Sequence, residues 1–161
     1  MSESISSWLA GRLPDEWFDG APEVTVDRDE VVVVGRLAAV DGGADAEAGR
    51  IARFREQTRE QRMAVAREAE HRFARKVAWG AACGDTRELF TTLSVPVMTR
   101  LRQPERRVLD TLVDAGVARS RSHALAWCVR LVGQHTDDWL TSLREALQEV
   151  ERLREQGPGA A

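Results

Sequence analysis

The feature that most constrains the fold is the stretch 89–135, where a short strand pattern is followed by two helix patterns with a glycine between them. Thr91, Leu93 and Val95 alternate with Phe90, Thr92 and Ser94, which is the period of a half-buried strand. Pro104 suits the first turn of a helix, and Gly116 suits the position just past its end. One strand and two short helices bury too little surface to be stable alone. The stretch therefore predicts a dimer in which two such strands pair antiparallel.

The second helix pattern begins at the Ser-Arg-Ser run 120–122. Either serine suits the N-cap, because a serine hydroxyl accepts a hydrogen bond from the first helical turn. The strand around Leu93 and Val95, the run 112–116 and the Ser-Arg-Ser run together carry a family resemblance. The stretch resembles the ribbon-helix-helix family of DNA-binding proteins, the Arc and CopG type, over less than a third of the chain.

The resemblance implies where DNA would be bound. In that family the paired strands enter the major groove, and the start of the second helix offers backbone N–H groups to a phosphate. The outward strand positions hold a phenyl ring and two hydroxyls here, which lack the bidentate reach that discriminates strongly between bases. Two arginines before the first helix would add phosphate contacts. The implied nucleic-acid-binding residues are Phe90, Thr92, Ser94, Arg100, Arg102, Ser120, Arg121 and Ser122.

Three further patterns surround this stretch. Residues 23–27 and 31–35 are rich in valine and flank a charged turn, which predicts a β-hairpin. Residues 46–80 predict one long helix. Apolar residues recur near every 3.5 positions over 140–153, which predicts a C-terminal helix with a coiled-coil-like seam. The predicted fold class is mainly α with short β: a ribbon-helix-helix dimer module, preceded by a β-hairpin and a long helix and followed by a C-terminal helix.

Composition divides the chain into four predicted segments, with the clearest linker at the glycine-rich run just before residue 45. Residues 1–44 form an acidic N-terminal helix plus β-hairpin, and residues 45–88 form the long arginine-rich helix and a glycine joint. Residues 89–136 form the ribbon-helix-helix module, and residues 137–161 form the coiled-coil-like helix and a tail.

Charge is distributed unevenly over these segments. The whole chain has a formal net charge of −3, yet residues 89–136 hold seven basic and three acidic residues and a net charge of +4. A basic segment is expected where a protein contacts nucleic acid. On the long helix, Arg55, Arg59 and Arg62 share one side. They are possible secondary binding residues for a phosphate backbone, although a solvated helix with ion pairs is the favoured interpretation.

Three large aromatic residues, Trp8, Trp17 and Phe18, lie in the acidic N-terminal segment. Either they pack on the rest of the chain or they form a motif that docks on a partner. Packing is the favoured interpretation, because exposed clusters of aromatic side chains are exceptional in folded proteins.

The sequence predicts no catalytic residues, no metal site and no cofactor. Its three histidines have no evident orienting partners, so no Ser/His/Asp or Cys/His arrangement is predicted. Cys83 and Cys128 lack metal-ligand spacing and lie among apolar residues, which indicates buried thiols. The N-terminus does not have the pattern of a signal peptide, and no apolar run reaches the length of a membrane span. We therefore expect a cytoplasmic protein with no membrane partner.

Two functions are compatible with these patterns. The leading hypothesis is a non-enzymatic, homodimeric DNA-binding protein that regulates transcription. The alternative is an interaction or adaptor protein, which would use the ribbon-helix-helix only to dimerise and would dock on a protein or RNA assembly. The basic module favours the regulator, whereas the weak outward strand residues favour the adaptor.

Overall fold

The computed structural model describes residues 2–156 and divides them between two compact units. The N-terminal unit spans residues 1–97 and the C-terminal unit spans residues 98–161. The fold is α/β, with a mixed sheet and three helices in the first unit and three helices in the second.

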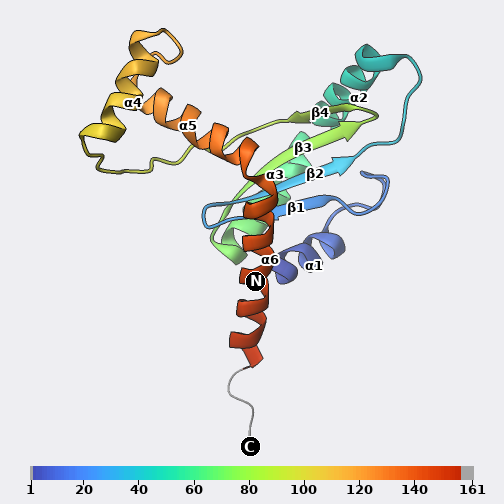
Figure 1. The fold of residues 1–161 in the computed structure, drawn as a ribbon. Helices are drawn as coiled ribbons and strands as arrows, with labels where there is room; N and C mark the ends of the chain where they lie inside the picture. The colour runs from blue at the N-terminus through green and yellow to red at the C-terminus, as the bar shows by residue number, and fades with distance from the viewer. Residues whose placement is uncertain (1, 157–161) are drawn as a thin grey trace, which may run out of the picture. The chain divides into compact units, whose positions relative to one another are not determined.

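A four-stranded sheet forms the centre of the N-terminal unit (Figure 1). Its strands, in spatial as well as chain order, are β1 (Glu23–Val26), β2 (Glu30–Arg36), β3 (Lys76–Cys83) and β4 (Thr86–Leu89). The outer pairs are antiparallel, and the central pair β2–β3 is parallel, with Val33 opposite Trp79. A parallel pair needs a long crossover connection, and the helices between β2 and β3 provide it.

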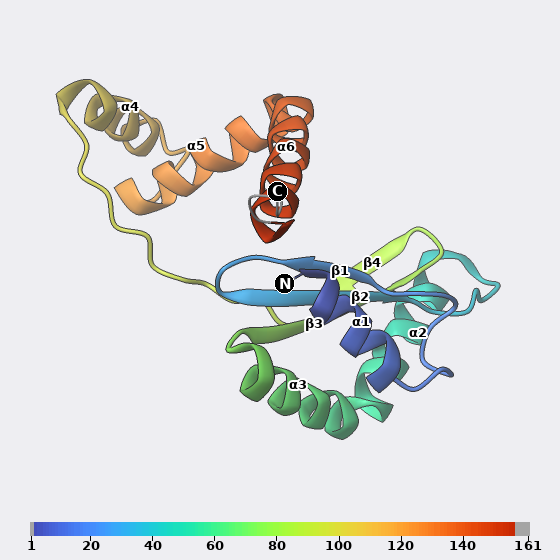
Figure 2. The same ribbon diagram turned by 90° about the horizontal axis from the view of Figure 1, so that it is seen from below.

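Three helices cover one face of this sheet: α1 (Ser2–Arg12), α2 (Gly43–Gln57) and α3 (Arg59–Phe73), as Figure 2 shows. The core lies between the helices and the inward side chains of β2 and β3. It includes Ile5, Leu9, Trp17, Val31, Val33, Ile51, Phe54, Val65, Trp79 and Cys83. Trp8 and Phe18 pack against this core, so the packing interpretation of the N-terminal aromatics is confirmed.

The predicted long helix is in fact two helices, which meet at Thr58. Thr58 is 8% exposed, and its hydroxyl donates a hydrogen bond of 2.6 Å to the carbonyl oxygen of Phe54. Such a bond back to the preceding turn bends a helix. The second helix ends at Phe73, where Ala74 adopts a left-handed conformation with φ of 54°. The long-helix prediction was therefore wrong, both in its continuity and in its C-terminal end.

The hairpin prediction is confirmed by β1 and β2, but the rest of the sheet was missed. The segment around Gly80 was interpreted as a glycine joint and is instead the centre of β3. A Cβ atom at Gly80 would lie 2.7 Å from the carbonyl oxygen of Glu88 and 2.8 Å from the Leu89 side chain, so this glycine permits close strand packing. The predicted mainly α fold class is corrected to α/β.

The C-terminal unit contains α4 (Gln103–Asp114), α5 (Arg121–His135) and α6 (Asp137–Gln156). Pro104 lies in the first turn of α4, and Gly116 follows its end with φ of +74°. Ser120 is the N-cap of α5 and accepts a hydrogen bond of 3.1 Å from the backbone N–H of His123. The predicted helix–glycine–helix arrangement and the serine cap are therefore confirmed.

The predicted ribbon strand is absent from the part of the chain that the structure describes. Residues 91–102 have no regular secondary structure, whereas Leu89 belongs to β4 and pairs with Gly80 of β3. The alternation that suggested a ribbon is therefore the end of an intramolecular sheet and the start of an exposed segment. The ribbon-helix-helix fold assignment was wrong.

None of the helices within residues 2–156 is long and apolar enough to cross a membrane.

Candidate nucleic-acid interface

Exposed arginines lie on α4, on the chain that enters it and just before the N-cap of α5. Arg106 donates a hydrogen bond of 2.8 Å to the carbonyl oxygen of Leu101, which fixes the chain against the first turn of the helix. Leu101 in turn packs against the small core of this unit. The exposed arginines of this surface are Arg100, Arg102, Arg106, Arg107 and Arg119, and within residues 2–156 none of them forms an ion pair with a carboxylate. We call these five residues the arginine surface.

Arg121 connects the start of α5 to α4. Its guanidinium donates two hydrogen bonds to the carboxylate of Asp110, at 2.6 and 2.8 Å. This hydrogen bonding lowers the pKa of Asp110, and the nearby charge of Arg106 lowers it further. The Arg121–Asp110 pair therefore links α5 to α4. Arg106 of α4 and Arg121 of α5 both act on the Asp110 carboxylate. Arg121, which was predicted to contact phosphate, is bound to a carboxylate in this structure.

The start of α5 has the geometry of a capped helix. The Ser120 hydroxyl accepts a hydrogen bond from the His123 N–H, and the backbone N–H of Arg119 donates to Nδ1 of His123 at 3.3 Å. The first turn of a helix carries N–H groups without intrahelical partners and a partial positive charge, both of which favour an anion. Ser122, also predicted at this site, is exposed in that first turn.

The three predicted strand residues lie outside this surface. Phe90 is 8% exposed and packs in the core of the N-terminal unit, where its ring centre lies 6.3 Å from that of Phe54. Thr92 and Ser94 are exposed in the irregular segment that follows β4. The structure therefore does not bring these residues together with the start of α5 in one unit.

Two of the three residues of the predicted secondary site, Arg55, Arg59 and Arg62, contact the ring of Phe90. The guanidinium carbons of Arg55 and Arg62 lie 5.4 and 4.8 Å from the centre of the Phe90 ring. Arg55 also forms an ion pair of 3.1 Å with Glu88. Arg59 is exposed and forms no ion pair within the described residues.

Arg62 is 6% exposed and has no carboxylate partner in the described part of the chain. It donates to the Thr58 hydroxyl at 2.9 Å and to the Arg55 carbonyl at 2.6 Å. Burial, and then the positive charges of Arg55 and Arg59, lower the pKa of Arg62 to about 10. The residue is therefore a structural cation, and sequence periodicity placed it on a helix face without showing that Thr58 and Phe90 would bury it.

A groove of about 780 Å³ in the N-terminal unit was missed by sequence reasoning. Acidic side chains from the chain after α1 line it together with two arginines of α2 and a floor of aromatic rings. These residues are Asp15, Glu16, Asp19, Arg50, Arg53, Trp17, Phe18 and Phe54. Among the described residues, no cluster of His, Cys, Asp and Glu could hold a metal ion there or elsewhere. Because the lining charges come from two segments that are far apart in the sequence, no local motif could have revealed the groove.

Comparison with known proteins accounts for both units of the chain. Residues 3–89 match the family model described as "Rv1265-like protein, N-terminal domain", and residues 102–154 match the model described as "Mb1296 C-terminal domain". Two curated relatives are Rv1265 of Mycobacterium tuberculosis and Mb1296 of Mycobacterium bovis. Each is 57% identical over 161 residues, which cover 98% of this chain and 71% of the relative.

The chain belongs to the Rv1265-like family. This membership replaces the ribbon-helix-helix resemblance, which was wrong. The two matched regions end and begin on either side of the irregular segment after β4, in agreement with the two compact units. The names of the Rv1265 and Mb1296 relatives describe both as uncharacterized proteins, and no solved structure matches the chain. A function for this Rv1265-like chain must therefore be argued from its own surface.

Proposed function

We propose that this protein is a homodimeric, non-enzymatic DNA-binding protein, with a role in regulating transcription, and that its C-terminal unit contacts the DNA backbone. The observation that carries the proposal is the arginine surface, whose five guanidiniums are exposed and form no ion pair with a carboxylate among the described residues, although the charge of Arg106 acts on Asp110. Cations left unpaired by their own protein are available for phosphates, and each phosphate neutralised releases a condensed counterion. Such a protein would act in the cytoplasm.

Local charge supports the proposal. Residues 98–136 carry seven arginines and three carboxylates, a net charge of +4, whereas residues 137–161 have a net charge of −3. One of the three carboxylates, Asp110, is already neutralised by Arg121. The basic charge is therefore concentrated on α4, the chain before it and the start of α5, where the capped helix N-terminus adds N–H donors for a phosphate.

A double substitution tests the arginine surface. Arg107→Gln with Arg119→Gln removes two charges from exposed positions, so folding should change by less than about 0.5 kcal/mol. At about 50 mM salt the double variant should bind duplex DNA at least roughly tenfold more weakly than the wild type does. The loss should be the same for every duplex sequence, because backbone contacts carry no sequence information. Fluorescence anisotropy with random and defined duplexes measures the affinity.

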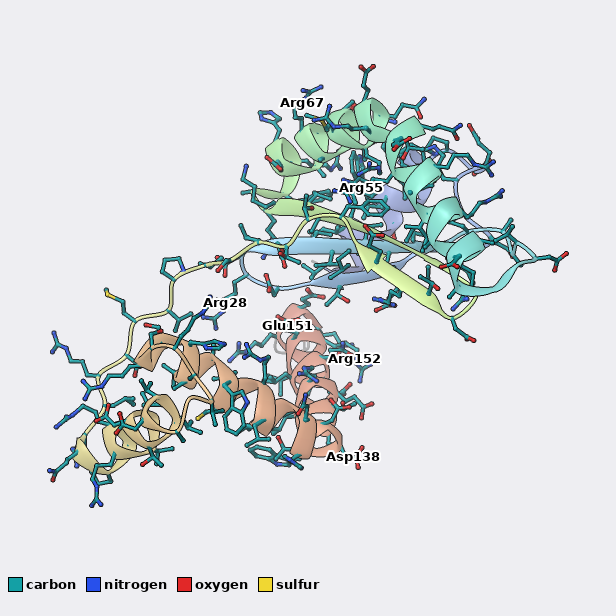
Figure 3. The ribbon with its side chains drawn as sticks, turned by 90° about the horizontal axis from the view of Figure 1, so that it is seen from above. Arg28, Arg55, Arg67, Asp138, Glu151 and Arg152 are labelled. Carbon is teal, nitrogen blue, oxygen red and sulfur yellow. The ribbon has the colours of Figure 1, made fainter. Side chains whose placement is uncertain are left out.

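Arg67→Gln supplies the matched control. Arg67 is exposed on the side of α3 away from the sheet, in the other unit (Figure 3), and its loss should leave DNA affinity unchanged. Equal affinity of the double variant and the wild type would refute the proposed surface. Retention of RNA or of a protein from lysate, with no affinity for DNA, would instead favour the adaptor function.

A further inference from the structure

Helix α6 exposes a continuous apolar stripe. No residue of this 20-residue helix is buried. Large side chains recur along one side at intervals of three and four residues, with exposed fractions of 42% for Leu143, 63% for Leu147 and 43% for Val150. Leu140, which is half-buried, begins the series. We call Leu140, Leu143, Leu147 and Val150 the α6 stripe.

The C-terminal unit buries little apolar surface within itself. Its buried core consists of Leu109, Ala118 and Ala124, with partly buried neighbours on α4, α5 and the chain before α4. None of these core residues belongs to α6. A domain of roughly 60 residues is only marginally stable by itself, and so small a core makes a partner for this unit favourable. Three more large apolar residues of this unit are exposed: Val129 at 65%, Val132 at 54% and Trp139 at 62%.

The stripe has the spacing that a second copy of the same helix would bury. Positions 140, 143, 147 and 150 follow the alternating three- and four-residue steps of a heptad seam, in which side chains of one helix fit between those of another. By contrast, the large exposed apolar residues on the folded elements of the N-terminal unit, Met63 and Leu89, lie on different elements. That unit therefore offers no matching seam within the described residues.

Charges beside the stripe are self-complementary. Arg144 and Glu151 lie on the same edge of the stripe, one heptad apart, and have opposite signs. Because an antiparallel helix pair brings like edges together, Arg144 of one copy would face Glu151 of the partner subunit, twice by symmetry. Elsewhere Glu149 and Arg152 pair within the helix. Figure 3 shows Asp138 at the start of α6 and Glu151 and Arg152 toward its other end.

We propose that the α6 stripe is the interface with a second copy of this chain, with the two α6 helices antiparallel. Helix α6 alone is on the order of 30 Å long and about 10 Å wide, so its face is smaller than the roughly 800 Å² per partner that standard interfaces bury. Val129, Val132 and Trp139 supply further exposed apolar surface in the same unit. This interface rests on the proposed function, which includes a homodimer. It places the contact between the two copies on α6 in place of paired ribbon strands.

Analytical ultracentrifugation of the full chain tests the interface. The wild type should sediment as a dimer, at twice the chain mass of 17.9 kDa. Leu147→Glu should raise the dimer dissociation constant at least about 100-fold, because it places a charge in the centre of the seam. Gln148→Glu, which adds the same charge outside the stripe, about 100° around the helix from Leu147, should remain dimeric. Circular dichroism should show equal helix content in both variants.

Charge exchange tests the antiparallel arrangement. Arg144→Glu should weaken the dimer severalfold, and adding Glu151→Arg in the same chain should restore it. Leu147→Ala should also weaken the dimer. Because this substitution introduces no charge at an exposed position, it should leave the folding of the single chain unchanged. Failure of the exchange to restore the dimer would overturn the antiparallel pairing.

The possible failures are distinguishable. A dimer that none of the stripe substitutions weakens would overturn the interface and leave the homodimer intact. A monomeric wild type would overturn both the interface and the homodimer. Neither result depends on the DNA measurement, which uses substitutions on α4 and before α5.

Discussion

Arg62 is the residue whose environment differs most from what its type suggests. A guanidinium that is 6% exposed, next to two other arginines and with no carboxylate among the described residues, is unfavourable by itself. The Thr58 hydroxyl, the Arg55 carbonyl and the face of the Phe90 ring compensate for the lost water. Together these contacts attach the residue after β4 to the junction of α2 and α3. Arg62 therefore fixes the point where the chain leaves the sheet.

Arg62→Ala should destabilise the N-terminal unit by roughly 1–3 kcal/mol, because it leaves buried acceptors unsatisfied and removes packing from Phe90. Denaturant unfolding followed by tryptophan fluorescence measures the change in the free energy of unfolding. Arg67→Ala, at an exposed position of the same helix, should change it by less than about 0.5 kcal/mol. Equal effects of the two substitutions would contradict the structural role of Arg62.

Among the elements, the β1–β2 hairpin shows how a turn is specified by one carboxylate. Oδ1 of Asp27 accepts hydrogen bonds of 2.8 Å from the backbone N–H groups of Asp29 and Glu30. These bonds, first that of Glu30 and then that of Asp29, hold the pKa of Asp27 below its usual value of 3.8. Because the folded-state pKa is the lower one, the stabilisation is present above pH 3.8 and is lost as the pH falls through the folded-state value.

Asp27→Ala should therefore cost about 0.5–1 kcal/mol at pH 7, a modest value because the turn is exposed. The difference from the wild type should shrink once the pH falls below 3.8, since the protonated wild-type side chain is a weaker acceptor. Parallel urea titrations at pH 7 and pH 2.5 measure it. A difference that is constant across this range would show that the carboxylate charge contributes nothing to the turn.

Sequence periodicity predicted the elements whose own residues specify them. The hairpin, the serine-capped α5 and the glycine after α4 follow from local patterns, and the structure confirms them. The strand β3 was missed because its small residues around Gly80 resemble a flexible joint until β4 and β2 are seen to pack against them. Thr58 broke the predicted long helix for a similar reason, since a threonine hydroxyl bends a helix only in a particular packing environment.

At the scale of the whole molecule, the prediction of the site failed where it depended on the wrong strand. Phe90 was assigned outward because alternation alone cannot distinguish a ribbon strand from the chain that follows β4, and the structure places Phe90 in the core. Arg100 and Arg102, in the chain before α4, were named from the sequence and are exposed, whereas Arg106 and Arg107 of α4 were not among the predicted residues. The α6 stripe is likewise visible in the sequence, but only the structure shows that α4 and α5 of the same unit leave it exposed.

If exposed arginines of this protein bind the DNA backbone, as we propose, its affinity for duplex DNA must depend steeply on salt concentration. We predict that the full chain binds random duplex DNA at about 50 mM salt. The logarithm of its affinity should fall linearly with the logarithm of the salt concentration, with a slope of about −3 or steeper, because each phosphate contact contributes about −0.9. An absence of binding at 50 mM salt, or a slope near zero, would contradict the account.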